Sequence, residues 1–547
     1  MKKTLSILLI VAMLFSALSL ATVAAPAGTA ITSAAELKAM SASGTYYLAN
    51  DITISGNWDM TTIFSGTLDG DGHTIYIADG TTLAGGLFRE LKNPTIKNLN
   101  IVQKGNATYN TATSSTLNNT IEGTGVLAAL AYGDDKGSPM CTITDVYIYA
   151  NLNATHGKNV GGFIGEVRYG ALQMTRCVFD GSITATGGTD NFGVGGMVGG
   201  TWQRSYSFNI QECINYATIK ADAVAGGIFG TNRVGGYSGD GAANCLRNTR
   251  FEYCINYGDV TTTASEYAGG IFGTYKMNDY AVQIRFRNNI NFGTVTNAAA
   301  AVSGKNRCAG GIGGGFRGTS TSGTTSQLMG NINYGTVNAS WNSNMVANPW
   351  TGSIATRDLN YCGNTFGSGY GSTEITDAAA TVSSLNSAGF DNTKPAIYSL
   401  LPNGKITLTW AKERGYGAET AGSAKTTFVG AQLSGTAADA SRNVRFVGGL
   451  DAEFTDLDEV GVMIIASYGD GQTKTFEGQT ATVYESIIAD GEVILATDNG
   501  VDYFYTAVIN NIPTNVGTVT FKVFAYQLDD GAVVYSNSTT LTVDLAA

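Results

Sequence analysis

Short apolar runs bounded by glycines recur through the middle of the chain. Each run reads Gly-Gly, two apolar residues and Gly, as in Gly226–Gly230, and the copies begin at residues 161, 195, 226, 269 and 310. Only the fifth copy departs, with Gly313 in an apolar position. Short runs rich in Ile, Val and Phe indicate strands rather than helices. A period of roughly 20–50 residues is typical of proteins built from stacked repeats.

A second motif, Ile-Asn-aromatic, follows the later copies. With the Cys or Asn that precedes it, the motif occupies residues 213–216, 254–257, 289–292 and 331–334. A unit of two or three short strands cannot bury its own apolar face, whereas a stack of such units can. We therefore expect like residues to form columns, with a hydrogen-bonded ladder of Asn215, Asn256, Asn291 and Asn333. The glycines are expected to permit tight corners at positive φ. The pattern predicts a parallel β-helix whose coils have loops of unequal length.

These repeats resemble the GLUG-type repeats of bacterial surface proteins. The entry segment FSGTLDGDGHTI, residues 64–75, resembles the first coil of that family and of the wider pectin-lyase-like β-helices. The resemblance covers about residues 31–410. It implies a right-handed parallel β-helix, in agreement with the handedness of parallel crossovers, and a helix and Trp-ending strand after the last coil.

Four segments are predicted along the chain. Residues 1–25 read as a signal peptide, with Lys2 and Lys3 before an apolar stretch and small residues at its end. Residues 26–410 form the β-helix and residues 411–425 a linker. Residues 426–547 carry strands at short spacing and predict a small β-sandwich that resembles Ig-like modules. The fold class is therefore all-β, a right-handed solenoid followed by a sandwich.

Two helices are expected to cover the ends of the solenoid. Residues 33–42 begin with Ser33 and carry Glu36 three residues later, the spacing of a capping box. Residues 374–388 are expected to cap the far end, because open ends would expose unpaired strand edges.

Composition and charge narrow the environment of the protein. The chain has 547 residues, 71 of them Gly, and a formal net charge of −11, which removal of the two signal-peptide lysines takes to −13. This charge argues against nucleic acid and anionic membrane surfaces as partners. We expect a secreted protein, extracellular or at the cell surface, with no membrane span in the mature chain.

The cysteines predict buried thiols rather than disulfides. Seven Cys and only two His are present, with no Cys-x-x-Cys pair, so neither a metal site nor a cofactor is predicted. Cys177, Cys213 and Cys254 occupy one repeat position that Asn289 and Asn331 fill later. A column of buried free thiols is favoured over disulfides, because free Cys behaves as a small hydrophobe.

Catalytic candidates are few. Asp69, Asp71 and His73 alternate and can share one face of a strand, although Asp-Gly-Asp-Gly is also a common turn sequence, which is the favoured interpretation. The loop 134–136, Asp-Asp-Lys, can mimic part of a lyase site but is more simply a solvated loop. Arg285 and Arg287 flank Phe286 and should share the opposite, outer face.

Aromatic residues after the Gly-Gly runs are the candidate ligand-binding residues, interleaved with Arg204, Arg233 and Lys276. They are Trp202, Tyr206, Tyr237, Tyr275 and Tyr280. Loops from one point of successive coils emerge on one side, where rings can stack on sugars. The alternative is that the rings pack together and hold long loops down.

The interpretation we favour is adhesion or glycan binding without catalysis, with an extracellular polysaccharide or a host or cell-surface glycan as partner. The alternative is a polysaccharide lyase or glycoside hydrolase on the same scaffold. An enzyme of either kind would need a convergent carboxylate pair, and none is recognisable in the sequence.

Overall fold

The protein is represented by a computed structural model. Of the 547-residue chain, the structure describes residues 27–111, 123–133, 140–156, 158–233, 248–276, 283–301, 307–317, 325–340, 342–346, 356–363, 372–390, 394, 396–401, 404–414, 426–434, 441–451, 459–466, 472–476, 479–489, 495–496, 502–529, 532–535 and 539–545. The predicted signal peptide and most of the predicted linker lie outside these residues.

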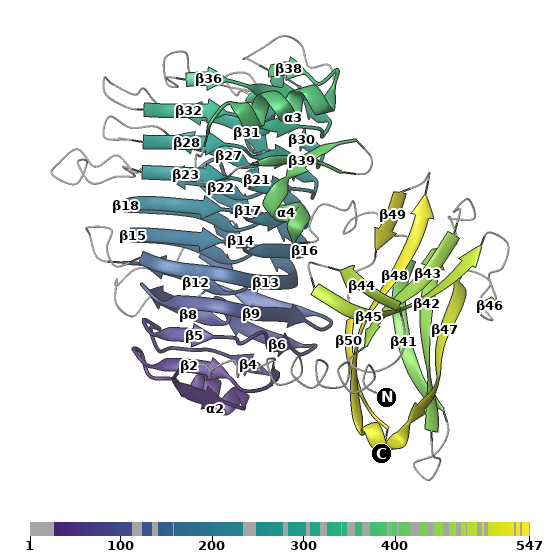
Figure 1. Cartoon of the computed structure of the whole chain (residues 1–547). Helices are drawn as coiled ribbons and strands as arrows, with labels where there is room; N and C mark the ends of the chain where they lie inside the picture. The colour runs from purple at the N-terminus through teal and green to yellow at the C-terminus, as the bar shows by residue number, and fades with distance from the viewer. Residues whose placement is uncertain are drawn as a thin grey trace, which may run out of the picture.

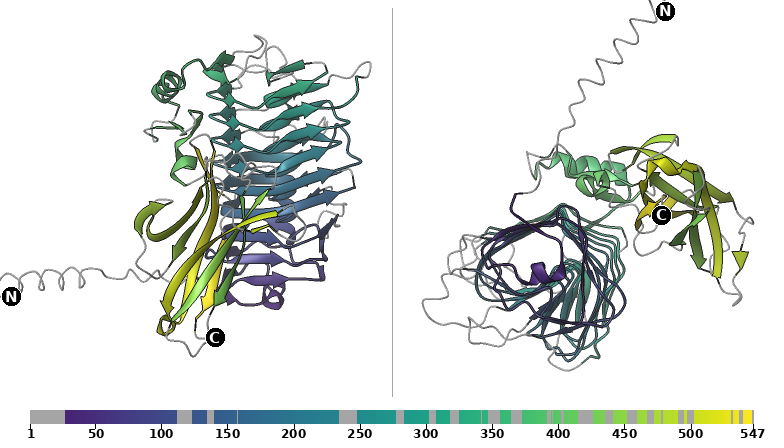
Figure 2. Two further views of the ribbon diagram at one scale, coloured as in Figure 1. Left: turned by 90° about the vertical axis from the view of Figure 1, so that its right-hand side faces the viewer. Right: turned by 90° about the horizontal axis from the view of Figure 1, so that it is seen from below.

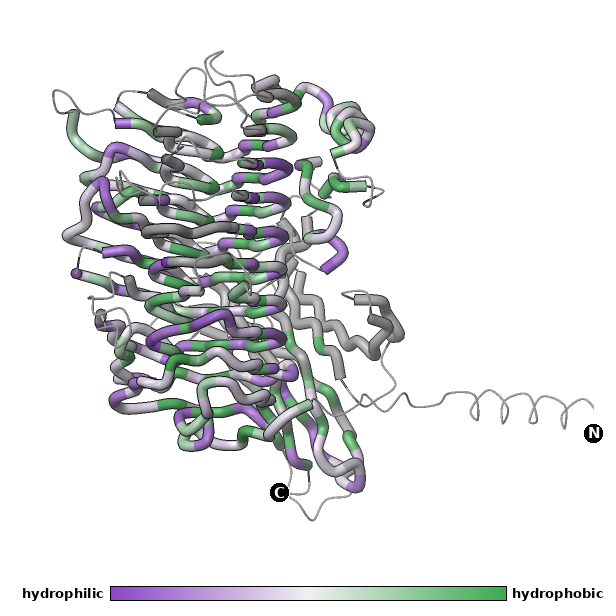
Figure 3. Tube along the Cα trace, turned by 90° about the vertical axis from the view of Figure 1, so that its left-hand side faces the viewer, coloured by the Kyte–Doolittle hydropathy of each residue, from purple (hydrophilic) through white to green (hydrophobic). Residues whose placement is uncertain are grey.

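The described structure consists mostly of β-strands, with few helices (Figure 1). A 35-stranded sheet holds strands that pair in parallel with their counterparts in the next repeat. Hydrophilic and hydrophobic residues alternate along many of these strands (Figure 3). The alternation places one set of side chains inside the stack and the other outside. The coarse prediction of an all-β protein is confirmed.

The two strands of each Gly-Gly motif form two columns of the stack. The first column contains β11 (Gly123–Gly125), β14 (Asn159–Gly161), β17 (Gly193–Gly195), β21 (Val224–Gly226), β26 (Tyr267–Gly269), the first part of β31 (Cys308–Arg317) and β35 (Asn342–Val346). The second contains β8 (Phe88–Lys92), β12 (Ala128–Tyr132), the first parts of β15 (Ile164–Thr175) and β18 (Val198–Gln211), β22 (Phe229–Arg233), β27 (Phe272–Lys276) and the later part of β31.

A third column runs the length of the stack. It contains β1 (Thr29–Ile31), β2 (Thr45–Leu48), β5 (Thr67–Asp69), β9 (Thr95–Gln103), β13 (Met140–Ala154), the later parts of β15 and β18, β23 (Asn248–Glu252), β28 (Gln283–Arg287), β32 (Thr325–Met329) and β36 (Thr356–Asp358).

The Ile-Asn-aromatic motif forms a fourth column, and the β-branched residues after it form a fifth. The fourth contains β3 (Ile52–Ile54), β6 (Thr74–Ile77), later parts of β9 and β13, the first part of β16 (Val178–Ala185), β19 (Ile214–Asn215), β24 (Ile255–Asn256), β29 (Ile290–Asn291), β33 (Ile332–Asn333), β37 (Asn360–Cys362) and β38 (Ser372–Glu374). The fifth contains the ends of β13 and β16, β20 (Thr218–Ala221), β25 (Val260–Thr262), β30 (Val295–Asn297) and β34 (Val337–Ala339). A small parallel sheet joins β4 (Asn57–Trp58), β7 (Thr81–Ala84) and β10 (Ala107–Asn110).

The predicted asparagine ladder is present. Nδ2 of Asn215 donates to Oδ1 of Asn256, Asn256 donates to Asn291, and Asn291 donates to Asn333, each at 2.7 Å. All four side chains are fully buried. Each Nδ2 also donates to the backbone carbonyl two residues further on. Apart from the Asn215 oxygen, which begins the ladder, these buried amides are satisfied by their own repeat and by the neighbouring ones, which fixes the register of the stack.

The ladder explains the second glycine of each Gly-Gly motif. A Cβ added to Gly227 would lie under 3.0 Å from the Asn256 side chain and from the carbonyl oxygen of Gly270. Both contacts recur at Gly196 and Gly270, and at Gly311 the contact is with the Asn333 side chain. None of these glycines has a positive φ. The prediction of positive-φ corners is therefore wrong for these glycines, which instead permit close backbone approach.

Inside the stack, the cysteines form another column of buried side chains, in addition to the asparagine ladder. Cys177, Cys213 and Cys254 are fully buried and free, as predicted. The column continues as amides, with Asn289 donating to Asn331 at 3.0 Å. Asn331 in turn donates to Asn360 at 3.0 Å. Burial raises the pKa of Cys177 and of Cys213 well above the ordinary value. The Cys213 thiol adds to the rise in the pKa of Cys177, whereas for Cys213 the hydrogen bond with Cys177 opposes the rise and Cys254 adds to it.

The N-terminal helix is shorter than predicted. It spans α2 (Ala34–Lys38), and the Ser33 hydroxyl accepts from the Glu36 backbone N–H at 3.3 Å. The Glu36 carboxylate accepts from the Thr32 backbone N–H at 2.7 Å, one residue before the capping-box position. Leu37 and Met40 are buried among the interior residues of the stack, consistent with a helix that covers this end.

The later helix does not cap the far end. The segment with α3 (Ala378–Ser387), β39 (Tyr398–Leu400), β40 (Ile406–Leu408) and α4 (Thr409–Glu413) packs along the side of the stack (Figure 2). We call residues 375–414 the return segment. Its residues Leu385 and Leu408 share a buried cluster with Ile255 and Ile290 of successive repeats. Because these isoleucines face outward, they need a cover, and the return segment supplies it. Trp410, predicted to end a strand, lies in α4.

The C-terminal part forms two antiparallel sheets. One contains β41 (Thr426–Ser434), β42 (Ser441–Asp451), β47 (Asp502–Pro513) and β46 (Leu495–Ala496). The other contains β44 (Gln472–Phe476), β45 (Gln479–Ala489), β43 (Glu459–Ala466), β48 (Thr518–Asp529), β49 (Ala532–Tyr535) and β50 (Thr539–Asp544), and a 3-10 turn, η2 (Thr514–Val516), precedes β48. The rings of Phe446 and Phe521 meet edge-on across the two sheets, with centroids 5.2 Å apart. Within the described residues, no helix has the length and apolar character needed to span a membrane.

Replacing one ladder amide should destabilise the stack. Asn256→Leu would leave Nδ2 of Asn215 with the Ala217 carbonyl alone and would remove the donor to Oδ1 of Asn291, so we expect a loss of about 1–3 kcal/mol in unfolding free energy. Asn338→Leu is the matched control, because Asn338 is exposed on β34. Thermal or denaturant unfolding measures both variants. Equal unfolding free energies of the two variants would contradict a stabilising role of the asparagine ladder.

The buried thiols should be inert while the protein is folded. Burial raises the pKa of Cys141 to about 12, so its thiol stays protonated, and hence unreactive, throughout neutral and mildly alkaline pH. We expect iodoacetamide at pH 8 to leave Cys141, Cys177, Cys213, Cys254, Cys308 and Cys362 unmodified until denaturant is added. Peptide mass spectrometry measures each site, and a disulfide at Cys213 would contradict the prediction.

Candidate functional site

A turn with positive φ closes the third column in most repeats. Such φ values are uncommon outside glycine, yet here they recur at one position. The residues are Asn98, Asp145, Arg176, Glu212, Tyr253, Asn288, Gly330 and Leu359, with φ between 51° and 68°. The turn directs successive side chains outward along one edge of the stack.

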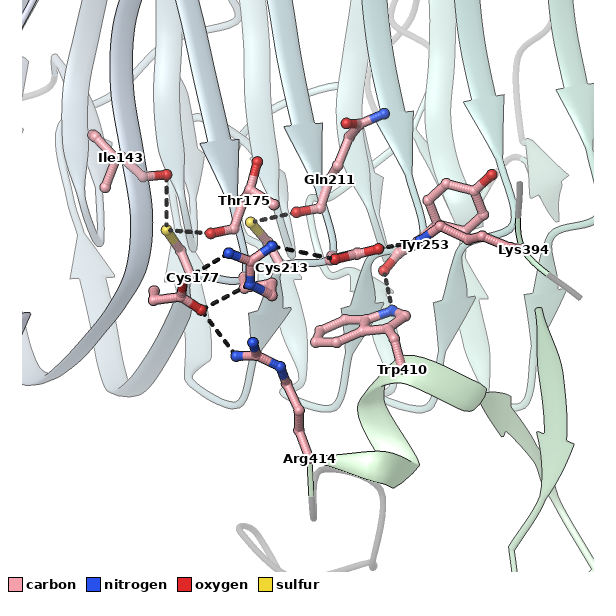
Figure 4. Close-up of polar contacts among 12 residues, drawn as sticks. Ile143, Thr175, Cys177, Gln211, Cys213, Tyr253, Lys394, Trp410 and Arg414 are labelled. Atoms are coloured by element: carbon pink, nitrogen blue, oxygen red, sulfur yellow. Dashed lines mark hydrogen bonds and ion pairs between the residues drawn. The ribbon is translucent and has the colours of Figure 1, made fainter. Parts of the chain in front are cut away.

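This edge holds the return segment through charges (Figure 4). Arg176 forms a bidentate pair with Asp145, at 2.8 and 2.6 Å, and Arg414 of the return segment reaches the same carboxylate at 2.9 Å. Lys394 pairs with Glu212. Partial burial acts to raise the pKa of Asp145, but Arg176 and Arg414 outweigh it and lower that pKa. Opposite charges alternate along this edge and pair with one another. We therefore interpret these contacts as holding the return segment in place rather than as a binding site, and we call them the clasp.

The return segment also binds this edge through neutral groups. The indole N–H of Trp410 donates to the Tyr253 carbonyl at 3.1 Å. The hydroxyl of Tyr398, fully buried, contacts both the Asn288 side chain at 2.8 Å and the Gly330 carbonyl at 2.5 Å. The clasp therefore spans several repeats, with both ionic and neutral contacts.

A different row of outward residues lies on the third column, and we call it the polar row. Backbone pairing aligns, one per repeat, Thr45, Thr67, Thr95, Thr142, Gln173, Asn209, Arg250, Arg285, Gln327 and Thr356. Strands lie about 4.8 Å apart, so nine spacings extend roughly 40 Å. The residues of the row with described side chains are half-buried, apart from Thr45, which is exposed.

Two arginines stand side by side within the polar row. Arg250 pairs directly with Arg285 in the parallel ladder. Among the described residues, neither guanidinium forms an ion pair with a carboxylate. The buried Nε of Arg250 makes no hydrogen bond within the described structure, and neither do the side-chain oxygens of the flanking Asn209 and Gln327.

The next outward row differs. Two residues further along the same strands, Glu252 lies beside Arg287, with Nε of Arg287 2.6 Å from the carboxylate. Gln211 donates to the same carboxylate at 2.8 Å, and Arg287 also reaches the Phe390 carbonyl. The charges in this next row are therefore complementary and paired with each other. The charges of Arg250 and Arg285 in the polar row have no such partner among the described residues.

The surroundings of Arg285 are electropositive. Burial first, then Arg287 and Arg250, lowers the pKa of Arg285, while Glu252 and Tyr253 partly oppose the shift. Like charges directly opposite each other on neighbouring strands are destabilising. The arrangement costs stability and leaves a pair of forked donors with no carboxylate partner among the described residues, a chemistry that suits carboxylate or sulfate groups.

Of the sequence-predicted trio, Asp69 and Asp71 form a turn, which is the interpretation that the sequence favoured. The Asp71 backbone N–H donates to Asp69 Oδ1 at 3.0 Å, and Asp71 has a φ of 49°. Lys97 binds the other oxygen of Asp69 at 2.9 Å. Partial burial acts to raise the pKa of Asp69, but Lys97, the Asp71 N–H and Asn98 lower it overall. His73 faces Asp51 instead, at 3.3 Å.

The predicted aromatic ridge is wrong for Tyr275. This residue lies in β27 with 1% exposure, its hydroxyl 2.8 Å from Thr249 and its ring edge-on to Phe286. Trp202 and Tyr206 lie within strand β18 rather than in a loop, and Trp202 aligns with Arg168 and Arg233.

Several other candidates are not tested. The loop 134–136, Tyr237 and Tyr280 lie outside the described residues, as does Cys245, and the side chains of Trp202 and Tyr206 are not described. Across the part of the chain that the structure describes, no group of three His, Cys, Asp or Glu side chains is placed to hold a metal ion.

Comparisons of this chain with protein-family models, with curated proteins and with solved structures found no match. The interpretation of the site therefore depends on its geometry.

Of the arginine pair, the sequence indicated Arg285 as an outward residue but did not indicate Arg250. The outward direction of Arg285 and Arg287, opposite the buried Phe286, is confirmed. Arg250 was missed, because its alignment with Arg285 depends on the length of the intervening loop. The available signal was that each lies four residues before a motif position, Cys254 or Asn289, and that these two align in the repeats.

The two neighbouring arginines should differ in their effects on stability. Arg285→Gln removes a like-charge contact, so we expect unfolding free energy to stay the same or rise by about 0.2–1 kcal/mol. Arg287→Gln leaves the nearly buried Glu252 with only Gln211, so we expect a loss approaching about 3 kcal/mol. Denaturant unfolding of both variants at equal salt measures the difference. A large loss from Arg285→Gln would mean that this residue has a structural partner.

Proposed function

We propose that the protein is a secreted or cell-surface binding protein whose ligand is an extracellular polysaccharide or a host or cell-surface glycan. In this proposal the stack is a right-handed parallel β-helix of GLUG-type repeats, and the C-terminal sheets form an Ig-like β-sandwich. The repeats act as a rigid scaffold, and binding takes place without catalysis.

The polar row carries this proposal. It presents hydroxyl, amide and guanidinium groups at a regular spacing of about 4.8 Å on one outward face. Sugars expose many hydroxyl groups, which pair with such side chains over several units of a polymer. A long, regular row suits an extended ligand better than a compact small molecule, which binds in a concave pocket.

The enzyme alternative has less support. A lyase or glycosidase needs an acid or base whose environment tunes its pKa to the reaction. The pKa of Asp69 is instead lowered by Lys97 and its other hydrogen-bond partners, and its neighbour Asp71 completes a turn. Catalysis by residues outside the described structure is the outcome that product analysis would reveal.

A glycan array with parallel product analysis tests the proposed function. We expect the full chain to bind at least one class of polysaccharide and to leave the chain length of the bound polymer unchanged. Size-exclusion chromatography of the polymer, with absorbance of unsaturated ends, measures cleavage. Shortened polymer would support the enzyme alternative, and an array without any bound glycan would contradict the proposed function.

A further inference from the structure

We infer that Arg250 and Arg285 together form an anion site, which holds a sulfate or carboxylate group of an acidic polysaccharide lying along the polar row. This inference rests on the proposed function and adds the chemical class of the ligand. It names the part of the row that recognises charge and distinguishes it from the hydroxyl and amide groups on either side.

The geometry places two donors where one anion can bridge them. Arg250 and Arg285 occupy paired positions of adjacent parallel strands, β23 and β28, and their side chains leave the same face. The phenylalanines that follow them, Phe251 and Phe286, are buried and stacked at 5.2 Å, which fixes the opposite side of both strands. The two strands are therefore held rigidly, and the guanidinium groups cannot separate by backbone movement.

On the same strands, the charged side chains that stabilise the fold occur as pairs of opposite sign. Glu252 and Arg287 are complementary, in contact and nearly buried, two residues beyond the arginine pair. The clasp follows the same rule, because Asp145, Arg176 and Glu212 alternate in sign. The arginine pair departs from this rule, because no carboxylate of the described structure forms an ion pair with either guanidinium. A locally unfavourable arrangement without internal compensation points to an external partner.

The flanking groups narrow the partner to an acidic sugar polymer. Asn209 precedes Arg250 in the row and Gln327 follows Arg285, and both amide side chains are half-buried on the same face as the arginines. Amide side chains pair with sugar hydroxyl groups, which inorganic sulfate does not provide. Further along, the row continues with Gln173 and threonines, which are uncharged. A chain with an acid group over the arginines and hydroxyls on both sides matches this order of groups.

Because the protein has a net negative charge, binding of an acidic polymer has to depend on a local site such as the arginine pair. With a formal net charge of −11, the chain repels polyanions at long range. Nonspecific attraction to a basic surface therefore does not account for binding of an acidic polymer by this protein. Any such binding must come from a local cluster of cations that no neighbouring carboxylate neutralises.

The test uses the full chain with four probes, measured by isothermal titration calorimetry. Dextran sulfate carries sulfate groups, polygalacturonate carries carboxylates, dextran is the neutral control, and inorganic sulfate lacks sugar. We expect binding of dextran sulfate or polygalacturonate, no binding of dextran, and at least 100-fold weaker binding of inorganic sulfate. The first two probes distinguish sulfate from carboxylate as the recognised group.

Variants then locate the site. The double variant Arg250→Gln/Arg285→Gln should weaken binding of the acidic probe at least tenfold, with its melting temperature unchanged or raised. Arg285→Lys keeps the charge but loses the forked donors, so an intermediate loss is expected. Lys220→Gln is the matched control, because it removes one exposed positive charge from β20, in another column, and should change affinity less than twofold.

Two results would overturn the inference. One is an affinity for the acidic probe that the double variant leaves unchanged. The other is binding of neutral glycans alone, with no dependence on either arginine, which would leave the proposed function intact. Absence of binding to every glycan would contradict both the inference and the proposed function, so the two failures are distinguishable.

Discussion

The later repeats of the stack depend on one contact, in which a ladder asparagine lies against the second glycine of the Gly-Gly motif. The Asn256 amide lies so close to Gly227 that a side chain at residue 227 would collide with it. The same amide donates to the next repeat at 2.7 Å. Width and register of the repeat are therefore set by one residue pair. Loops elsewhere in the repeat can differ in length because they do not enter this contact.

Much of the stack could be predicted from such pairs. The recurrence of Ile-Asn-aromatic gave the register of the ladder, and the shared position of Cys213 and Asn289 gave the buried second column. Alternation placed Arg285 outside, opposite Phe286. The alignment of Arg250 with Arg285 appears only when both are counted back four residues from the motif positions Cys254 and Asn289, because the repeats differ in length. The burial of Tyr275 likewise required knowledge of where β27 ends.

The return segment shows why local patterns can mislead about packing. Its helix α3 has the length and capping of an end cover, with Asp377 at its N-terminus. Outward isoleucines such as Ile255 and Ile290, however, leave an apolar stripe along the side of the stack. Burying that stripe is worth more than covering one terminal repeat, since the gain scales with apolar area. The chain therefore turns back along the side and is fastened by Arg414 and Lys394.

The asparagine ladder also gives the stack an electrical direction. Every side-chain amide donates from the earlier repeat to the later one, so the amide dipoles point the same way along the axis. The oxygen of Asn215 begins the series without an acceptor role, because Phe179 lies at the corresponding place in the preceding repeat. Aligned amides polarise one another, as successive peptide groups do in a helix. The interior of this β-structure thus contains a small macrodipole, built from side chains, whose negative end lies at Asn215 and whose positive end lies at Asn333.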